Sequence, residues 1–374
     1  MIKVLQVTGG MNRAGAETML MNIYRCMDRT QVQFDFIVYD SLIQDYEEEI
    51  ISLGGKVFHL DCKPGWRMIL SINKIRDILR ENGPYKAIHV HTLFNSVYAL
   101  IAATIEGGVL KLTHSHSTKN SAKKSLLKKV YEIGSKLLIG LLSDVMLACG
   151  NDAGRYLFGN RFITHGAVIK NGIILNNFAS TDQETILNLK NEWSANNDLI
   201  IGSVARFEPV KNHKFMIDIA CELKARNINF KLVMAGVGSI LDDIKRKVIE
   251  NKLTDNVVFL GCRSDVEKLL HAFDVFLMPS LFEGTPVALI EAQGTGLPCL
   301  ISSCISSECN LGLGLIKRLS LNVSISQWCD LLTRHNRKHI HISQEEKEEM
   351  FEIHGYNVSS SAQKLHHLYL QSQQ

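Results

Sequence analysis

The chain has 374 residues, enough for two domains that each bury a full core. Apolar residues make up 46% and charged residues 21%, the ordinary balance of a soluble globular protein. The formal net charge is only +3, so composition gives no reason to expect nucleic acid as a partner. The first residues read as a strand rather than a signal peptide, and no apolar stretch is long enough to span a bilayer. We therefore expect a cytoplasmic protein.

The nine cysteines are scattered along the chain. They form no Cys-x-x-Cys pair and no Cys/His cluster with zinc-binding spacing. This distribution predicts buried apolar residues in a reducing compartment.

Short apolar runs alternate with helical patterns through the first half of the chain. We predict helices at 16–27, 66–81 and 96–106. Strands are predicted at 2–8, 33–39, 56–60, 87–91, 110–114 and 145–149. Strands that alternate with helices predict a mostly parallel, doubly wound sheet.

The pattern stops and then restarts. An Asn-Gly turn within 168–178 ends the first run, and a polar stretch without a strand continues to about residue 197. Strands are then predicted at 199–205, 230–235, 257–261, 274–278 and 298–301. The sequence thus predicts an α/β protein with two doubly wound domains, followed by a polar helical tail.

The stretch 274–298 carries the clearest signals. A buried strand leads into a helix for which Thr285 is the expected N-cap and Pro286 the first residue. Glu283 lies in the turn and Glu291 lies inside the helix. Ligands of open α/β sheets bind at the carboxyl ends of strands, and phosphates favour helix N-termini. We therefore expect a ligand site here.

Two further turns follow strands of the second half. Arg206 and Lys211 come after the strand at 199–205, and a nucleoside diphosphate needs such cations to offset its charge. A solvated basic pair is the alternative. Gly236 and Gly238 form a Gly-x-Gly turn after the next strand, either near a nucleotide or as a plain turn.

The first turn of the chain, 8–17, is rich in glycine and includes Gly10 and Gly15. Glycines let the backbone approach a ligand at the start of a helix. The turn is neither a Gly-x-Gly-x-x-Gly fingerprint nor a Walker loop, which argues against dinucleotide or ATP binding.

Four histidines end two strands of the first half. They are His89 and His91 on one strand, and His114 and His116 on the other. All are metal ligands by residue type, and the His-x-His spacing points both rings of a pair to one face. No acidic or cysteine ligand accompanies them, so we expect no metal and interpret His89 and His91 as packing and turn-capping residues.

A basic amphipathic helix is predicted at 119–136. Leucine, valine and isoleucine residues alternate there with Lys119, Lys123, Lys124, Lys128, Lys129 and Lys136. Such a helix can lie on an anionic membrane, or it can be a core helix with a solvated lysine face.

The setting of the two glutamates, SLFEGTPVALIEAQGTGLP, resembles the Glu-x7-Glu signature of retaining GT-B glycosyltransferases of family 4. The order Gly-x3-Arg-x4-Lys-Asn before it and the Gly-Gly-x3-Gly-Ala-Glu first turn also resemble that family. The resemblance implies two Rossmann-like domains with an inter-domain cleft. It implies an acceptor-binding domain at 1–175, a nucleotide-sugar-binding domain at 176–343, and helices at 344–374 that cross back to the first domain.

The resemblance also implies roles for single residues. Glu283 would contact the transferred sugar and act in catalysis, and Glu291 would bind the ribose. A histidine of the acceptor side would face the cleft, and the sequence leaves open whether it is His116 or His114. The other donor-site and cleft residues implied are Arg206, Lys211, Gly236, Gly238, Gly284, Thr285, Gly10 and Gly15.

We thus expect a retaining glycosyltransferase that moves a sugar from a nucleotide sugar, with UDP-sugar favoured, to a glycan or lipid-linked acceptor. The resemblance is to bacterial exopolysaccharide and capsule enzymes, which implies contact with the inner face of the plasma membrane. No Asp-x-Asp follows an apolar strand, so we expect no metal and no cofactor. The alternatives are a GT-B nucleotide-sugar epimerase or phosphorylase, and a non-catalytic two-domain sugar-binding protein.

Overall fold

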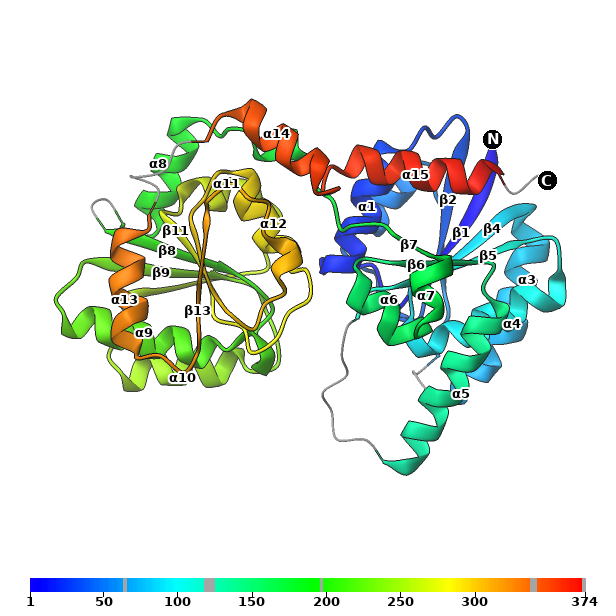
Figure 1. Cartoon of the computed structure of the whole chain (residues 1–374), viewed down its shortest axis with the longest axis horizontal. Coiled ribbons are helices and arrows are strands. Elements are labelled where there is room, and N and C mark those ends of the chain that lie inside the picture. The colour runs from blue at the N-terminus through cyan, green and yellow to red at the C-terminus, as the bar shows by residue number, and fades with distance from the viewer. Residues whose placement is uncertain (63–65, 118–124, 196–197, 337–341, 372–374) are drawn as a thin grey trace. The chain divides into compact units, whose positions relative to one another are not determined.

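The structure, a computed structural model, describes residues 1–62, 66–117, 125–195, 198–336 and 342–371. The chain divides into two compact units, shown in Figure 1. Unit 1 comprises Met1–Gly172 and Gly355–Gln374, and unit 2 comprises Ile173–His354. We describe each unit by itself.

Unit 1 is built on a seven-stranded parallel sheet with the order β3-β2-β1-β4-β5-β6-β7. Its strands are β1 (Ile2–Thr8), β2 (Val32–Val38), β3 (Val57–His59), β4 (Tyr85–Val90), β5 (Leu110–Ser115), β6 (Val145–Ala148) and β7 (Gly166–Val168). Strand β2 is buried along its whole length, as expected for a parallel strand covered on both faces. The edge strand β7 was not predicted.

The helices of unit 1 pack on this sheet. They are α1 (Gly15–Cys26), α2 (Glu47–Ser52), α3 (Ser71–Asn82), α4 (Ser96–Glu106), α5 (Leu126–Leu142), α6 (Asn151–Phe158), α7 (Arg161–His165) and α15 (Val358–Gln371). Helix α4 begins and ends where the sequence predicted. The predicted helix at 119–136 is confirmed from Leu126 onward and continues to Leu142, with Ser125 as N-cap, whereas residues 118–124 lie outside the described part.

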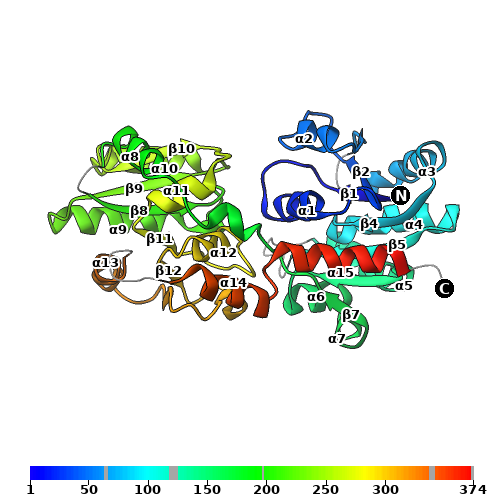
Figure 2. The ribbon, with the colours of Figure 1, turned by 90° about the horizontal axis from the view of Figure 1, so that it is seen from above.

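The C-terminal helix α15 belongs to unit 1 and packs beside α1 (Figure 2). Its Leu365 and Tyr369 are fully buried, and the Tyr369 ring meets the edge of Phe34 of β2 with centroids 5.8 Å apart. The last residues of the chain therefore complete the core formed by the first.

Unit 2 has a six-stranded parallel sheet with the order β10-β9-β8-β11-β12-β13. Its strands are β8 (Leu199–Val204), β9 (Phe230–Ala235), β10 (Val257–Gly261), β11 (Val275–Met278), β12 (Cys299–Ser302) and β13 (Ile316–Leu319). Its helices are α8 (Gln183–Glu192), α9 (His213–Ala225), α10 (Leu241–Glu250), α11 (Val266–Ala272), α12 (Val287–Gly294), α13 (Ile325–Arg334) and α14 (Gln344–Ile353). The predicted α/β class is confirmed, whereas β13 was missed.

Helix α14 belongs to unit 2. All of 344–374 was predicted to cross back to the first domain. The Lys347 ammonium donates to the carbonyl of Gly294 at 3.1 Å, which ties α14 to the end of α12. Return to unit 1 begins at Gly355.

The cysteines differ from the expectation of uniform burial. Cys262 and Cys304 are exposed, and all nine are free thiols. Within the described residues, no helix combines the length and apolar character needed to cross a membrane.

Candidate functional site

The strand order of unit 2 reverses between β8 and β11, which lie side by side at the centre of the sheet. In open α/β sheets this switch point, at the carboxyl ends of the strands, is where ligands bind. The turn after β8 carries Arg206 and Lys211, and the turn after β11 carries Glu283. Topology therefore places the predicted donor residues at the expected edge.

Lys211 and Glu283 form an ion pair, although 72 residues separate them. Their side chains are only 17% and 15% exposed, so water screens the pair less than an exposed one. The sequence predicted both residues at one site, and the structure brings their charged groups into contact. Arg206, by contrast, is exposed.

Backbone contacts hold the two turns in register. Lys211 ends a short 3₁₀ helix, and Asn212 adopts a left-handed conformation at φ +59°. The Asn212 amide donates to the carbonyl of Pro279 at 3.1 Å, and the Leu281 N–H donates to the carbonyl of Val210 at 2.8 Å. The ion pair is thus built on a preorganised backbone.

Gly236 and Gly238 support the turn after β8 from the side of β9. Their φ angles are +141° and +159°, which side chains rarely adopt. A Cβ atom at Gly236 would lie 2.0 Å from the Ala205 carbonyl oxygen, and one at Gly238 would lie 2.5 Å from that of Phe207. Close approach of two backbones therefore requires glycine at both positions.

Helix α12 begins at Val287, with Pro286 as N-cap. The predicted Thr285 cap is therefore wrong: Pro286 already has extended angles (φ −71°, ψ 117°), and no side chain caps the helix. Gly284 and Thr285 lie between the Glu283 turn and the helix.

Glu291 lies inside this helix. Burial, reinforced by the negative charge of Glu267, raises the pKa of Glu291 to about 7.

His213 lies two residues after Lys211 and was not singled out from the sequence. Its ring stacks on Phe207 with centroids 4.1 Å apart. Burial, together with the positive charge of Lys211, lowers the pKa of His213 to about 4. His213 is therefore a neutral support at physiological pH.

In unit 1 the strand order reverses between β1 and β4, and the glycine-rich turn follows β1. Gln44 organises this turn: its side-chain oxygen accepts from the Asn12 amide at 2.6 Å and from the Met11 N–H at 3.3 Å. A Cβ atom at Gly10 would lie 2.7 Å from that oxygen. A side chain at position 10 would therefore have to displace that of Gln44, whereas Gly15 is the exposed first residue of α1. No sequence signal marked Gln44.

The four predicted histidines gather at the ends of β4 and β5, beside that turn. Ring centroids lie 4.2 Å apart within each pair, His89 with His91 and His114 with His116. Nδ1 of His91 is 2.9 Å from Nε2 of His116. His89 and His114 are fully buried, whereas His116 is partly exposed. His116 is thus the more accessible of the two candidates.

All four rings are held neutral. Burial first, and then the neighbouring imidazoles, lower the pKa values of His89, His91 and His114 well below the ordinary range. Burial lowers the pKa of His116 to about 4. A neutral ring can accept a proton, which a histidine in its charged form cannot.

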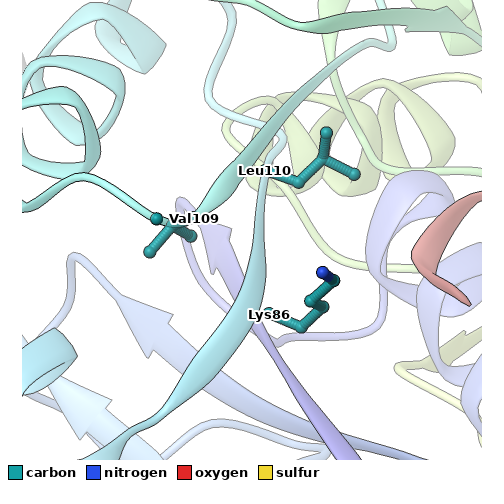
Figure 3. Close-up of a pocket in the computed structure, with 4 residues that line it drawn as sticks. Lys86, Val109 and Leu110 are labelled. Carbon is teal, nitrogen blue, oxygen red and sulfur yellow. The ribbon is translucent and has the colours of Figure 1, made fainter. Parts of the chain in front are cut away.

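A small hollow at the other end of β4 and β5 contains none of these residues. It is lined by Lys86, Gly108, Val109 and Leu110 (Figure 3). These residues begin or precede the two strands, whereas ligand sites of such sheets lie where strands end. We assign it no role.

Two family models match the chain. "Glycosyltransferase Family 4" matches residues 13–177, and "Glycosyl transferases group 1" matches residues 186–310. The protein EpsF of Bacillus subtilis is 41% identical over 334 residues, covering 89% of this chain and 87% of the relative. A UDP-Gal:alpha-D-GlcNAc-diphosphoundecaprenol alpha-1,3-galactosyltransferase of Escherichia coli is 28% identical, covering 60% of this chain and 59% of that protein.

Solved structures share the fold. Anabaena HepE in complex with UDP and glucose has a TM-score of 0.72 at 17% identity, covering 99% of this chain and 95% of that one. Sucrose-phosphate synthase of Thermosynechococcus elongatus has a TM-score of 0.77 at 14% identity, covering 100% of this chain and 99% of that one.

The fold and these similarities define a glycosyltransferase of the GT-B class. The chain belongs to glycosyltransferase family 4, the group 1 glycosyl transferases.

Proposed function

We propose that this enzyme transfers a sugar, with retention of anomeric configuration, from a UDP-sugar to a glycan or lipid-linked acceptor in cell-surface polysaccharide synthesis. The observation that carries the proposal is the Lys211–Glu283 pair at the β8/β11 switch point. The named substrates of the Escherichia coli relative and the UDP complex of HepE support the donor class. The Staphylococcus aureus relative CapH, a capsular polysaccharide glycosyltransferase, supports the pathway class.

In this proposal Arg206 and Lys211 bind the donor diphosphate and stabilise the leaving group. Lys211 is held against Glu283 before donor binds, so its charge is already in place at the moment of reaction. Glu283 contacts hydroxyls of the sugar, and Glu291 accepts hydrogen bonds from the ribose. We assign no nucleophile.

The turns of the donor site have simpler roles in the proposal. Gly284 and Thr285 present free backbone N–H groups beside Glu283, and Gly236 and Gly238 shape the wall next to Arg206. On unit 1, Gly10 and Gly15 shape the acceptor site. His116, or the deeper His114, contacts the acceptor hydroxyl there.

The proposal is tested by mass spectrometry of reactions with a panel of nucleotide sugars, with and without polyprenyl-diphosphate sugars as acceptors. We expect a glycosylated acceptor with one UDP-sugar. A changed nucleotide sugar without acceptor would instead indicate an epimerase, and phosphate-dependent release of sugar phosphate would indicate a phosphorylase.

We further propose that the transfer step needs no metal and no cofactor, because Arg206 and Lys211 supply the positive charge. Full activity is therefore expected after dialysis against excess EDTA, measured as the initial rate with the cognate donor. Activity that is lost in EDTA and restored by Mg²⁺ or Mn²⁺ would contradict the metal-free step.

A membrane-docking role for α5 is the last part of the proposal. One face of this helix packs on α4 and α6, with the Lys136 ammonium 4.4 Å from the Tyr156 ring centroid. The opposite face is apolar yet exposed, by 43–83% per side chain, at Leu126, Leu127, Val130, Ile133, Leu137, Leu138 and Leu141. The sequence left open whether this helix lies on an anionic membrane or is a core helix with a solvated lysine face. The structure has an exposed apolar stripe that a membrane interior would cover.

Binding to anionic vesicles should therefore depend on both kinds of residue. Lys-to-Gln changes at Lys123, Lys124, Lys128 and Lys129 should weaken co-sedimentation mainly at low salt, because salt screens their attraction to lipid. Leu127→Gln with Ile133→Gln and Leu137→Gln should weaken it at all salt concentrations, because the stripe inserts by apolar burial.

Ile249→Gln is the matched control, since Ile249 is 65% exposed on α10 of unit 2. Sedimentation of both α5 variants equal to that of the parent would reject the docking role. Loss of self-association instead, measured by analytical ultracentrifugation, would reassign the stripe to an interface between copies of this chain.

A further inference from the structure

The histidine cluster of unit 1 contains more ring nitrogens than its hydrogen bonds use. Nε2 of His89, both ring nitrogens of His114 and Nδ1 of His116 are buried without a hydrogen-bond partner among the described residues. A backbone contact with Ile169 raises the pKa of His114 and only partly offsets the effect of burial. Buried polar atoms are normally bonded, so these four require an explanation.

Two of the existing hydrogen bonds hold the rings from outside the cluster. Nδ1 of His89 lies 2.7 Å from the hydroxyl of Tyr369, and Nε2 of His91 lies 3.0 Å from the side-chain oxygen of Gln6. Gln6 and Tyr369 are both buried. Histidines that bind metals typically have such an outer partner on the second nitrogen, which fixes the ring and its tautomer.

Three ring nitrogens converge. His89, His91 and His114 each offer one, and these atoms lie within 4.8 Å of one another. Both nitrogens of His91 are hydrogen-bonded, to Gln6 and to His116, so metal binding would replace the bond between His91 and His116. Zinc binds imidazole nitrogen at about 2.0–2.1 Å, so ring rotation on the fixed strands must bring the nitrogens closer together around one ion. His116, with its ring centroid 4.2 Å from that of His114, is in position to be the fourth ligand.

Ligand type and access favour the same occupant. A metal binds imidazole through a ring nitrogen that carries no proton. His91 and His116 are partly exposed, which gives an ion a route to the two buried rings. A ligand set made only of imidazole suits zinc and its neighbours, whereas Mg²⁺ and Ca²⁺ need oxygen ligands.

We propose that His89, His91 and His114, with His116 as a fourth ligand, form a binding site for a divalent transition metal of the zinc class. The site lies in unit 1 and takes no part in the charge neutralisation proposed for unit 2. A bound ion would hold the histidine proposed above to contact the acceptor hydroxyl, so transfer is expected in EDTA, where that histidine is free.

The test is a Zn²⁺ titration of the full chain, stripped with EDTA, in competition with a chromophoric chelator. Cys262→Ser and Cys304→Ser form the background, because exposed thiols also bind zinc. We expect one Zn²⁺ per chain, and at least tenfold weaker binding in His91→Gln and in His114→Gln. Co²⁺ should give the visible absorption of a tetrahedral nitrogen site without a thiolate band.

His335→Gln is the control, since His335 is equally a buried histidine but lies in unit 2. Circular dichroism verifies that each variant is folded, and His91→Gln, at the partly exposed rim, serves if His114→Gln does not fold. Binding no tighter in the parent than in His91→Gln, or a stoichiometry that the cluster variants leave unchanged, would overturn the proposal.

Discussion

Replacing Lys211 or Arg206 with alanine should lower turnover strongly while the protein stays folded. Loss of one group that meets developing negative charge typically costs on the order of 3 kcal/mol, or about a hundredfold in rate. Lys211→Ala has a second consequence, because it leaves the half-buried Glu283 carboxylate without its cation. The measurement is the steady-state rate at saturating donor, with the thermal midpoint as the test of folding.

Lys214→Ala is the matched control, since Lys214 is exposed on the first turn of α9 and makes no predicted contact with donor. Lys211 and Glu283 touch, so the double variant Lys211→Ala/Glu283→Gln should lose less than the two single losses combined. Near-normal turnover in both alanine variants would contradict the proposal that the donor diphosphate binds at this edge of the sheet.

Glu283→Gln and Glu291→Gln should fail in different ways. Glu283 is next to the cation that meets the diphosphate, where contacts tighten as the anomeric bond breaks. Its glutamine variant should lose about a hundredfold in kcat with little change in donor KM. Glu291 binds a part of the donor that does not react, so losing its charged hydrogen bond should raise donor KM about tenfold and spare kcat.

The pH dependence separates Glu291 from Glu283. Glu291, with its pKa raised to about 7, is largely neutral at pH 6 and largely ionised at pH 8. The carboxylate is the stronger acceptor for ribose hydroxyls, so donor KM should fall as pH rises through 7. Glu291→Gln should abolish this trend.

The two glutamine variants also test where the transferred sugar binds. A loss of kcat in Glu291→Gln together with a raised donor KM in Glu283→Gln would show that the transferred sugar does not lie beside Glu283.

The sequence pattern predicted an element correctly where residues close in the sequence determine its structure. The buried strand before Glu283 and the helix after it were predicted, since an apolar run and a proline act over a few residues. Strands β7 and β13 were missed because they are short, incompletely buried edge strands without a continuous apolar run. Long-range contacts were also missed. His89 contacts Tyr369, which is 280 residues away in the sequence, and no residue spacing predicts that contact.

The two interpretations of the lysine-rich helix show a different limit of prediction from sequence. Its periodicity correctly predicted a helix with an apolar side, but periodicity does not say what covers that side. In the structure the protein covers the face with Glu132, Ser135 and Ile139, and the leucine-rich stripe is left to solvent.

The order of assembly follows from the way the chain leaves unit 1 and returns to it. Unit 2 is one continuous segment, whereas unit 1 lacks α15 until residues 358–371, which follow unit 2 in the sequence, are made. During synthesis from the N-terminus, the second unit in the sequence is thus the first whose chain is complete. Tyr369 contacts Gln6 of β1 and Phe34 of β2, so these strands lack that cover until α15 has been made. Early release of the chain would leave that apolar face open to chaperones.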